Sequence, residues 1–219
     1  MTECATAGAV AAGHRPRPVA RRAFPVAACG IGAHADAGID TDESDPTDGA
    51  EPAEPDQDEG EARISHTELR RVLGAFPTGV TALAGLVDGL PVGMAANSFT
   101  SVSLDPPLVS VCVATTSQTW PLLRRAARIG VSVLSHAQEE ASRRLATRGA
   151  DRFAGLAWYP TEDGAVLLAG ASAWLDCSVQ REIRAGDHEI VLLSVHGLDT
   201  DPAAPPLVFH ASRYRRLAA

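Results

Sequence analysis

The sequence contains no lysine, so all 19 of its cationic side chains are arginines. They are outnumbered by 27 acidic residues, which gives a net charge of −8. The acidity is concentrated near the N-terminus: residues 1–62 hold 13 acidic residues and 4 arginines, whereas the remainder holds 14 and 15. Neither part has the surplus of positive charge that nucleic-acid binding requires, so we expect no nucleic-acid partner.

Long apolar segments and paired cysteines are also missing. No run of about 18 apolar residues occurs, so the sequence predicts no membrane-spanning helix and no membrane partner. The four cysteines form no Cys-x-x-Cys pair or other metal-type spacing. Cys112 and Cys177 lie in apolar runs, and we expect them to be buried thiols rather than parts of a disulfide framework. We therefore expect a reducing, cytoplasmic location.

Familiar catalytic motifs are absent as well. The sequence has no Walker loop, no Gly-x-Ser-x-Gly, no His-Glu-x-x-His and no dinucleotide-binding fingerprint between a strand and a helix. The seven histidines are scattered, and no close pair with acidic neighbours suggests a metal site. A site made of hydroxyl groups, one arginine and one histidine, but no nucleophile, suits a protein whose cofactor supplies the chemistry.

The composition divides the chain into two parts. Residues 1–62 are poor in large apolar side chains and rich in alanine, glycine, proline and acidic residues, which predicts a disordered acidic N-terminal extension. Residues 63–219 are expected to form one folded domain. Arg21-Arg22 precedes a short apolar stretch, loosely in the order of an export signal. That stretch contains Pro25 and no leucine, so we favour the extension over the signal.

Apolar periodicity predicts a mainly β domain. A helix should begin at Ser65, because Ser65 can cap it and Glu68 follows three residues later. Further short helices are expected over residues 120–127 and 138–146. Asp88-Gly89 and Gly186-Asp187 are turn signals between strands, which favours an antiparallel barrel or sandwich. Residues 98–107 are expected to be irregular. The strands are predicted at residues 78–87, 90–95, 108–114, 130–134, 173–184, 188–197 and 207–210, with a short extended piece at 166–168.

One polar segment follows the second predicted strand. Residues 97–103 contain an asparagine and four hydroxyl side chains around Phe99, and Asp105-Pro106-Pro107 fixes an extended exit. These groups supply donors and acceptors without charge, with Phe99 as an aromatic wall. The residues alone slightly favour a turn whose hydroxyls bond to their own backbone over a ligand site.

Three further features could contact a ligand. Thr115 to Thr119 follow a buried strand and precede a helix, where a phosphate could dock or where Ser117 and Thr119 could simply cap the helix. His188 lies at a hairpin corner, where it could meet an anionic or aromatic ligand or face solvent. Arg152 could pair with a phosphate or be a solvated loop residue.

Several of these segments together resemble the short-chain flavin reductase family, whose fold is the FMN-binding split barrel. The resemblance rests on Phe76-Pro77-Thr78-Gly79-Val80-Thr81, Pro91-Val92-Gly93-Met94 and the long motif from Asn97 to Val109. The stretch from Gly149 to Gly155, the corner Gly186-Asp187-His188 and Tyr214 follow in the same order, so the resemblance covers about residues 66–217. Ser132 stands where many relatives have asparagine.

The resemblance implies an antiparallel split β-barrel, a homodimer, bound FMN or FAD, NADH or NADPH as electron donor, and a monooxygenase partner that uses the reduced flavin. It also implies roles for individual residues. Flavin contacts are implied for Asn97, Ser98, Phe99, Thr100, Ser103, Thr115, Ser117, Thr119 and Arg152, with the first four at the ring and the last four near the ribityl chain and phosphate. His188 is implied as the catalytic residue near the nicotinamide, with Tyr214 beside it. A flavoprotein with tightly bound FMN and its own substrate, or a simple flavin-binding module, is the alternative.

Overall fold

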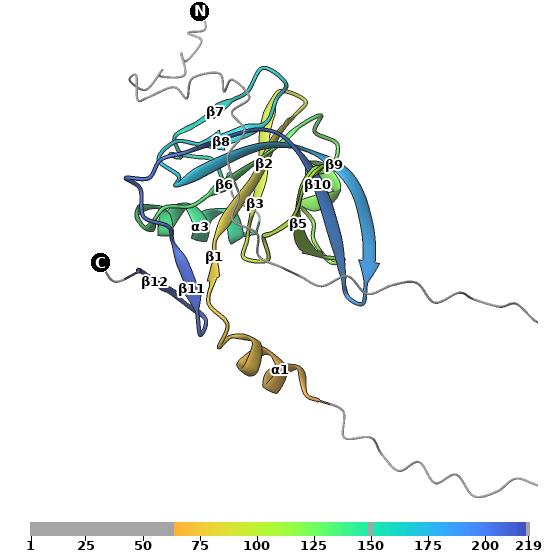
Figure 1. The fold of residues 1–219 in the computed structure, drawn as a ribbon, viewed down its shortest axis with the longest axis vertical. Helices are drawn as coiled ribbons and strands as arrows, with labels where there is room; N and C mark the ends of the chain where they lie inside the picture. Colours follow the sequence, from red (N-terminus) through yellow and green to blue (C-terminus); the bar gives the residue numbers. More distant parts are fainter. Residues whose placement is uncertain (1–63, 149–150, 218–219) are drawn as a thin grey trace, which may run out of the picture.

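The structure is a computed structural model that describes residues 64–148 and 151–217 (Figure 1). The acidic extension expected over residues 1–62 lies outside these ranges. The helices are α1 (His66–Leu73), α2 (Trp120–Leu123), η1 (His136–Gln138) and α3 (Glu139–Ala146). The strands are β1 (Thr78–Gly79), β2 (Thr81–Val87), β3 (Leu90–Ala96), β4 (Thr100–Leu104), β5 (Pro107–Ala114), β6 (Ile129–Val133), β7 (Trp158–Pro160), β8 (Val166–Leu168), β9 (Ala173–Ala185), β10 (His188–Thr200), β11 (Val208–His210) and β12 (Arg213–Arg215).

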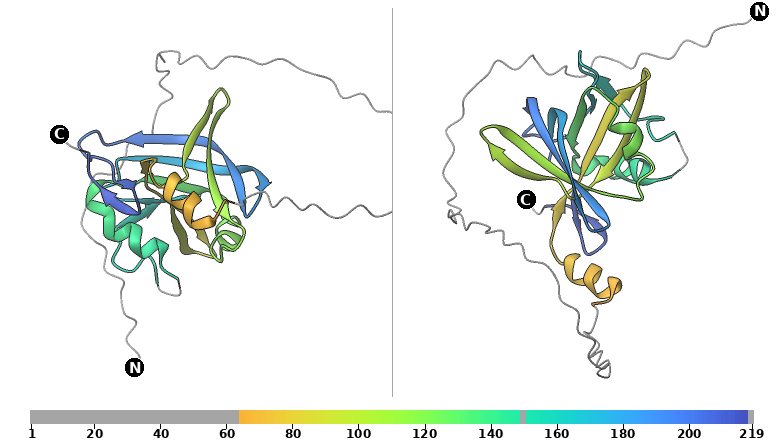
Figure 2. Two further views of the ribbon diagram at one scale, coloured as in Figure 1. Left: turned by 90° about the horizontal axis from the view of Figure 1, so that it is seen from below. Right: turned by 90° about the vertical axis from the view of Figure 1, so that its right-hand side faces the viewer.

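Seven strands form one antiparallel sheet in the order β3-β2-β6-β9-β10-β5-β4. Two small sheets, β1-β11-β12 and β7-β8, complete the fold. The long β9–β10 hairpin and the β4–β5 hairpin both extend from the body in Figure 2. The predicted mainly β, antiparallel class is therefore confirmed. No helix in the described ranges is long and apolar enough to cross a bilayer.

Strand β2 separates two apolar clusters, because successive side chains of a strand point to opposite faces. Leu83 belongs to an inner cluster, whereas its neighbours Ala82 and Ala84 belong to an outer one. The small alanines allow the elements that cover the outer face to pack closely. The inner cluster also contains Val111, Leu123, Val131, Val191 and Leu193, and the outer one Leu134, Leu145, Phe153, Val166, Leu168 and Leu207.

The hairpin turns form as the sequence predicts. Asp88 and Gly89 both have positive φ, at 52° and 80°, as a type I′ turn requires. Gly186 has a φ of 63° between β9 and β10. The second turn places His188 at the start of β10 opposite Ala114 of β5.

Three strands, β4, β7 and β12, were not expected. Residues 98–107 were predicted to be irregular, yet Thr100–Leu104 forms β4 and pairs with β5, with a register shift between Ser101 and Ser103. The hydroxyl-rich composition resembled a turn, but the exposed edge of β5 offered a partner for the backbone. Strand β12 pairs with β11 in a similar way at the C-terminal end of the described chain.

The expectation that both domain cysteines are buried was wrong for one of them. Cys177 is fully buried, and its burial raises the pKa of the thiol to about 12. Cys112 is exposed, because Val111 and Val113 on either side of it point into the core and strand alternation turns Cys112 outward.

Helix α1 begins as predicted, since the Ser65 hydroxyl accepts a hydrogen bond from the Glu68 amide at 3.1 Å. Nevertheless, the helix buries none of its own residues, and Figure 1 shows it extending away from the barrel. Its apolar face, formed by Leu69, Val72 and Leu73, is 43–62% exposed. The described chain therefore leaves this face uncovered.

The packing of β6 against β8 predicts the effect of one substitution. A Cβ at Gly130 would lie 2.2 Å from the carbonyl oxygen of Val166, so Gly130→Ala should lower the free energy of unfolding by about 1–3 kcal/mol in urea denaturation. Gly79→Ala is the matched control, because nothing lies within 4 Å of a Cβ there, and its effect should stay within about 0.5 kcal/mol. Equal effects of the two substitutions would contradict the close approach of these strands.

Candidate functional site

The residues predicted for the site all retain some solvent exposure. The structure places most of them in three groups. Asn97 and Tyr214 line an aromatic pocket. Thr115 and His188 lie at the corner where β5 ends beside the β9–β10 turn. Thr119 and Arg152 form part of a junction between helices and strands.

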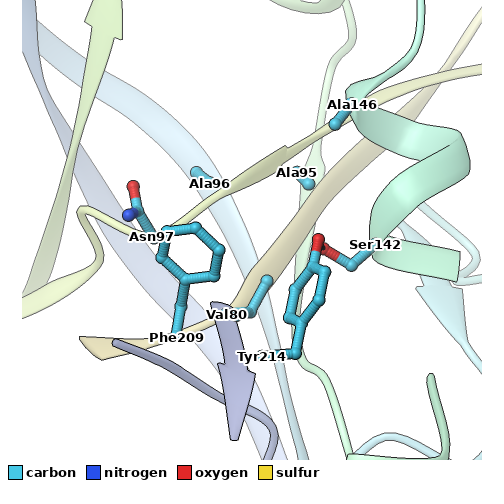
Figure 3. A pocket seen from close by; sticks show the side chains of 8 residues that line it. All are labelled: Val80, Ala95, Ala96, Asn97, Ser142, Ala146, Phe209 and Tyr214. Carbon is cyan, nitrogen blue, oxygen red and sulfur yellow. Dashed lines mark hydrogen bonds between the residues drawn. The ribbon is translucent and has the colours of Figure 1, made fainter. Parts of the chain in front are cut away.

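The aromatic pocket joins elements from both ends of the domain (Figure 3). Asn97 follows β3, Phe209 and Tyr214 come from β11 and β12, and Ser142 comes from α3. The pocket has a volume of about 230 Å³ and is open to solvent on one side. Its walls are mostly apolar, with a few polar groups, as is usual for sites that take small ligands. The lining is completed by Val80, Ala95, Ala96 and Ala146.

Two hydroxyl groups, those of Ser142 and Tyr214, form a hydrogen bond at the polar end of the pocket. The hydroxyls of Ser142 and Tyr214 lie 2.9 Å apart, and Ser142 is 2% exposed. The ring of Phe209 packs edge-on against Tyr214, with 5.4 Å between ring centres. The guanidinium of Arg143 lies 5.4 Å from the centre of the Tyr214 ring, within cation–π range. Tyr214 is therefore fixed from three sides.

Sequence reasoning identified Asn97 and Tyr214 but missed Ser142 and Phe209. A serine on a helix face that otherwise carries Ala141 and Leu145 was the available signal, because a buried hydroxyl needs a partner. Phe209 lies in a predicted strand and looked like an ordinary core residue.

The hydroxyl segment after β3 is used partly by the fold itself. The Ser98 hydroxyl accepts a hydrogen bond from the Cys112 amide at 2.9 Å and donates one to the Cys112 carbonyl at 3.0 Å. The Phe99 ring packs against the inner cluster, so it is not the free aromatic wall suggested by the sequence. Thr100 and Ser103 lie on β4, opposite Ser110 and Leu108 of β5. Ser98 thus fixes the path of the segment, while Asn97 and Thr100 remain exposed.

At the hairpin corner, Asp187 connects two predicted site residues. Its carbonyl oxygen accepts hydrogen bonds from the Thr115 amide at 2.9 Å and the Thr115 hydroxyl at 3.0 Å. Its carboxylate lies 2.8 Å from Nδ1 of His188. This hydrogen bond, and then the charge of His188, lowers the pKa of Asp187. The structure therefore brings Thr115 and His188 to one corner.

The guanidinium of Arg152 donates hydrogen bonds to three segments: strand β3, the residue after α3 and the residue before α2. Its Nε donates to the Thr147 carbonyl at 2.7 Å, and its Nη1 donates to the Gly93 carbonyl at 2.9 Å and the Thr119 hydroxyl at 2.6 Å. The Ser117 hydroxyl accepts a hydrogen bond from the Trp120 amide at 3.1 Å, which is the capping contact considered from the sequence. These bonds organise the loop before α2 and bring Thr119 and Arg152 together.

Ser132, the departure from the family pattern, does not line the pocket. It is fully buried, and its hydroxyl accepts a hydrogen bond from the Leu168 amide at 3.0 Å. Its role in this chain is to attach β8 to β6. Within residues 64–148 and 151–217, no group of three or more histidine, cysteine or acidic side chains could hold a metal ion.

Known proteins that resemble this chain share one domain family. The profile of the flavin reductase like domain family matches residues 73–218. The chain is 37% identical over 155 residues to the reductase subunit of a flavin-dependent monooxygenase from Mycobacterium tuberculosis, which covers 70% of this chain and 83% of that protein. It is 40% identical over 152 residues to a flavin reductase from Pseudomonas putida, covering 69% and 89%.

A solved structure extends the comparison to the fold. The NADH:FAD oxidoreductase of Streptomyces globisporus, solved in complex with NAD and FAD fragments, superposes with a TM-score of 0.66 at 41% identity. The match covers 76% of this chain and 98% of that one. The split β-barrel implied by the resemblance is thereby confirmed.

The bonds of Arg152 predict a structural effect that is independent of any ligand. Arg152→Ala would leave the Gly93 and Thr147 carbonyls without their donors, so the free energy of unfolding measured without flavin should fall by about 1–3 kcal/mol. Arg125→Ala is the control, because the side chain of Arg125 forms only an exposed ion pair with Asp88 at 3.3 Å among the described residues and should contribute less than about 1 kcal/mol. Unchanged stability of Arg152→Ala would assign Arg152 to ligand binding alone.

Proposed function

Because the chain belongs to the flavin reductase like domain family, we propose that it uses NADH or NADPH to reduce FMN or FAD and supplies the reduced flavin to a partner monooxygenase. The observation that carries this function is the match over residues 73–218, together with identities of 37–40% to proteins that are themselves flavin reductases or reductase subunits. The chain is an oxidoreductase.

The donor set suits the ring of a flavin. Asn97 lines the aromatic pocket, Ser98 and Thr100 follow it in the chain as further uncharged polar residues, and the backbone of Phe99 adds amide and carbonyl groups. A neutral site can hold both the oxidised and the reduced ring and then release it, because no fixed charge favours one state strongly. The Ser98 hydroxyl acts on the path of the segment through its two bonds to Cys112. Ser103 extends the polar edge along β4.

The phosphate side of the flavin is assigned to the loop before α2. Thr115, Ser117 and Thr119 carry hydroxyls along this loop, and Arg152 supplies its positive charge. The hydrogen bonds described for Arg152 use Nε and Nη1, so Nη2 is the nitrogen that we assign to a phosphate oxygen. Arg152 then has two roles, since the same side chain shapes the loop and faces the ligand.

The nicotinamide side is assigned to His188 and Tyr214. A bound flavin accepts the hydride that NADH or NADPH donates, and the protein contributes orientation and the exclusion of water. His188 orients the nicotinamide from the hairpin corner; the alternative role, balancing negative charge on the reduced flavin, would require a protonated imidazole. Tyr214, held by Ser142, closes the aromatic side of the pocket.

A homodimer is the proposed assembly. The described chain exposes large apolar side chains on α1 and on the edge strand β4, where Val102 and Leu104 are 48% and 68% exposed. An exposed edge strand and an uncovered apolar helix face normally require a partner surface. A second copy of the chain would cover them. We also place the protein in the cytoplasm, where the thiols of Cys112 and Cys177 stay reduced.

The function is tested by mixing purified protein with NADH or NADPH and free FMN or FAD and following the loss of nicotinamide absorbance. We expect flavin-dependent oxidation with at least one donor, by a colourless protein that turns over added flavin. Absence of flavin-dependent oxidation with both donors would refute the reductase function. A yellow protein with flavin that does not exchange would instead support the tightly bound flavoprotein.

The same assay tests the role of His188. His188→Ala should slow hydride transfer by about 10- to 100-fold, because misplacement of the nicotinamide costs a factor of this order, while flavin affinity changes little. His196→Ala is the matched control: His196 lies on the same strand, is exposed, and bonds only to Ser178 among the described residues. An unchanged rate in His188→Ala would remove His188 from the reaction.

Substitutions on α1 test the proposed homodimer. Leu73→Asp should shift the protein toward the monomer in light scattering after gel filtration, because a charge on a buried apolar interface is unfavourable. Arg71→Ser, on the opposite side of the helix, should leave the dimer intact. A wild-type protein that is monomeric at micromolar concentration would contradict the assembly.

A further inference from the structure

We propose that Asp187 is a positioning residue, which keeps a proton on Nδ1 of His188 and so presents Nε2 as a hydrogen-bond acceptor for the carboxamide of the nicotinamide. This inference rests on the proposed function, because it assumes that His188 faces the nicotinamide. It adds a residue outside the predicted site and a defined chemical contact with the electron donor.

The hydrogen bond between the two side chains fixes the place of the proton. Nδ1 of His188 lies 2.8 Å from Oδ1 of Asp187. The pKa of Asp187 is lowered, first by this hydrogen bond and then by the charge of His188, with a smaller contribution from His66 of α1. Asp187 is therefore ionised at neutral pH, and an ionised carboxylate can only accept. The donor in this bond must be Nδ1–H.

The backbone holds Asp187 in place for this contact. Its carbonyl oxygen accepts two hydrogen bonds from Thr115, at 2.9 and 3.0 Å, which tie the turn to the end of β5. Gly186 supplies the positive φ of the tight turn, at 63°. His188 is the first residue of β10 and lies between Ala114 and Ala185 on the neighbouring strands. The corner is therefore connected to both strands and to the polar loop.

The position of the proton decides what His188 can recognise. A neutral histidine in water prefers the proton on Nε2, so the carboxylate of Asp187 reverses the ordinary preference. Nε2 then carries a lone pair and accepts a hydrogen bond. The carboxamide of a nicotinamide has N–H groups that can donate to it. This contact would orient the ring that carries the hydride.

Solvent exposure limits how strongly the Asp187–His188 hydrogen bond can affect the rate of the reaction. The side chains of Asp187 and His188 are 93% and 45% exposed in the described chain, so water competes with their hydrogen bond. In the buried triad of serine proteases, replacing the aspartate by asparagine costs about 10⁴ in rate through the wrong tautomer. For Asp187→Asn we expect a loss of rate on the order of tenfold, because water weakens the hydrogen bond of an exposed pair.

The tautomer can be observed directly by long-range ¹H–¹⁵N NMR of the full chain labelled in histidine, at alkaline pH. His188→Gln identifies the signals of this residue among the seven histidines. The wild type should show Nδ1–H, whereas Asp187→Asn and Asp187→Ala should show mainly Nε2–H or a mixture. An Nε2–H tautomer in the wild type, or no change in either variant, would overturn the proposal.

Kinetics with two donors test the carboxamide contact. Asp187→Asn should lower kcat/KM for the preferred nicotinamide donor by about tenfold, with flavin affinity within about twofold of wild type. The second donor is the reduced 3-acetylpyridine analogue of the nicotinamide dinucleotide, which lacks the carboxamide N–H. With it, kcat/KM of the same variant should fall by less than about twofold, because the hydrogen bond to Nε2 of His188 is already missing. An equal loss with both donors would overturn the contact.

A control separates this inference from the proposed function. Asp88→Asn changes an exposed aspartate in the turn between β2 and β3 and should leave both the His188 tautomer and the rate unchanged. A wild type without reductase activity would refute the proposed function, whereas the NMR result would still decide whether Asp187 sets the tautomer. An active wild type with an unaffected Asp187→Asn would refute only the inference.

Discussion

The antiparallel pairing of β5 with β10 is the constraint on which the arrangement of the site depends. In this register His188 lies opposite Ala114, and Ile190 lies opposite Cys112. The backbone of Cys112 then holds Ser98 on one side, while the turn before His188 holds Thr115. A shift of one residue would turn every side chain of the strand to the other face and separate these groups.

Much of the polar chemistry near the site belongs to the protein itself. The hydroxyl of Ser98, that of Ser117 and two nitrogens of Arg152 bond to backbone or side-chain groups of the described chain. Such bonds restrict how the loops can move, and they keep the remaining polar groups in fixed directions. A flavin reductase benefits from this arrangement, because the cofactor carries the reactive atoms and the protein must mainly hold two rings in order.

The aromatic pocket depends on closure of the fold at its two ends. Asn97 leaves β3 early in the domain, whereas Phe209 and Tyr214 are close to its end, and α3 contributes Ser142 (Figure 3). Pairing of β1 with β11 brings these segments together. Helix α1 precedes β1 in the chain, and none of its own residues is buried in the described structure.

The sequence by itself determined the mainly β class, the hairpin turns, the cap of α1 and the family, because these depend on local periodicity, turn residues and a long specific motif. It did not determine that Thr100–Leu104 would become an edge strand, since a hydroxyl-rich segment forms a turn or a strand according to the partner available. Nor could it predict that Ser142 would meet Tyr214, that Arg152 would bond to three elements, or that Cys112 would face outward. Only tertiary structure decided these points, because each depends on groups far apart in the chain or on which face of a strand the core selects.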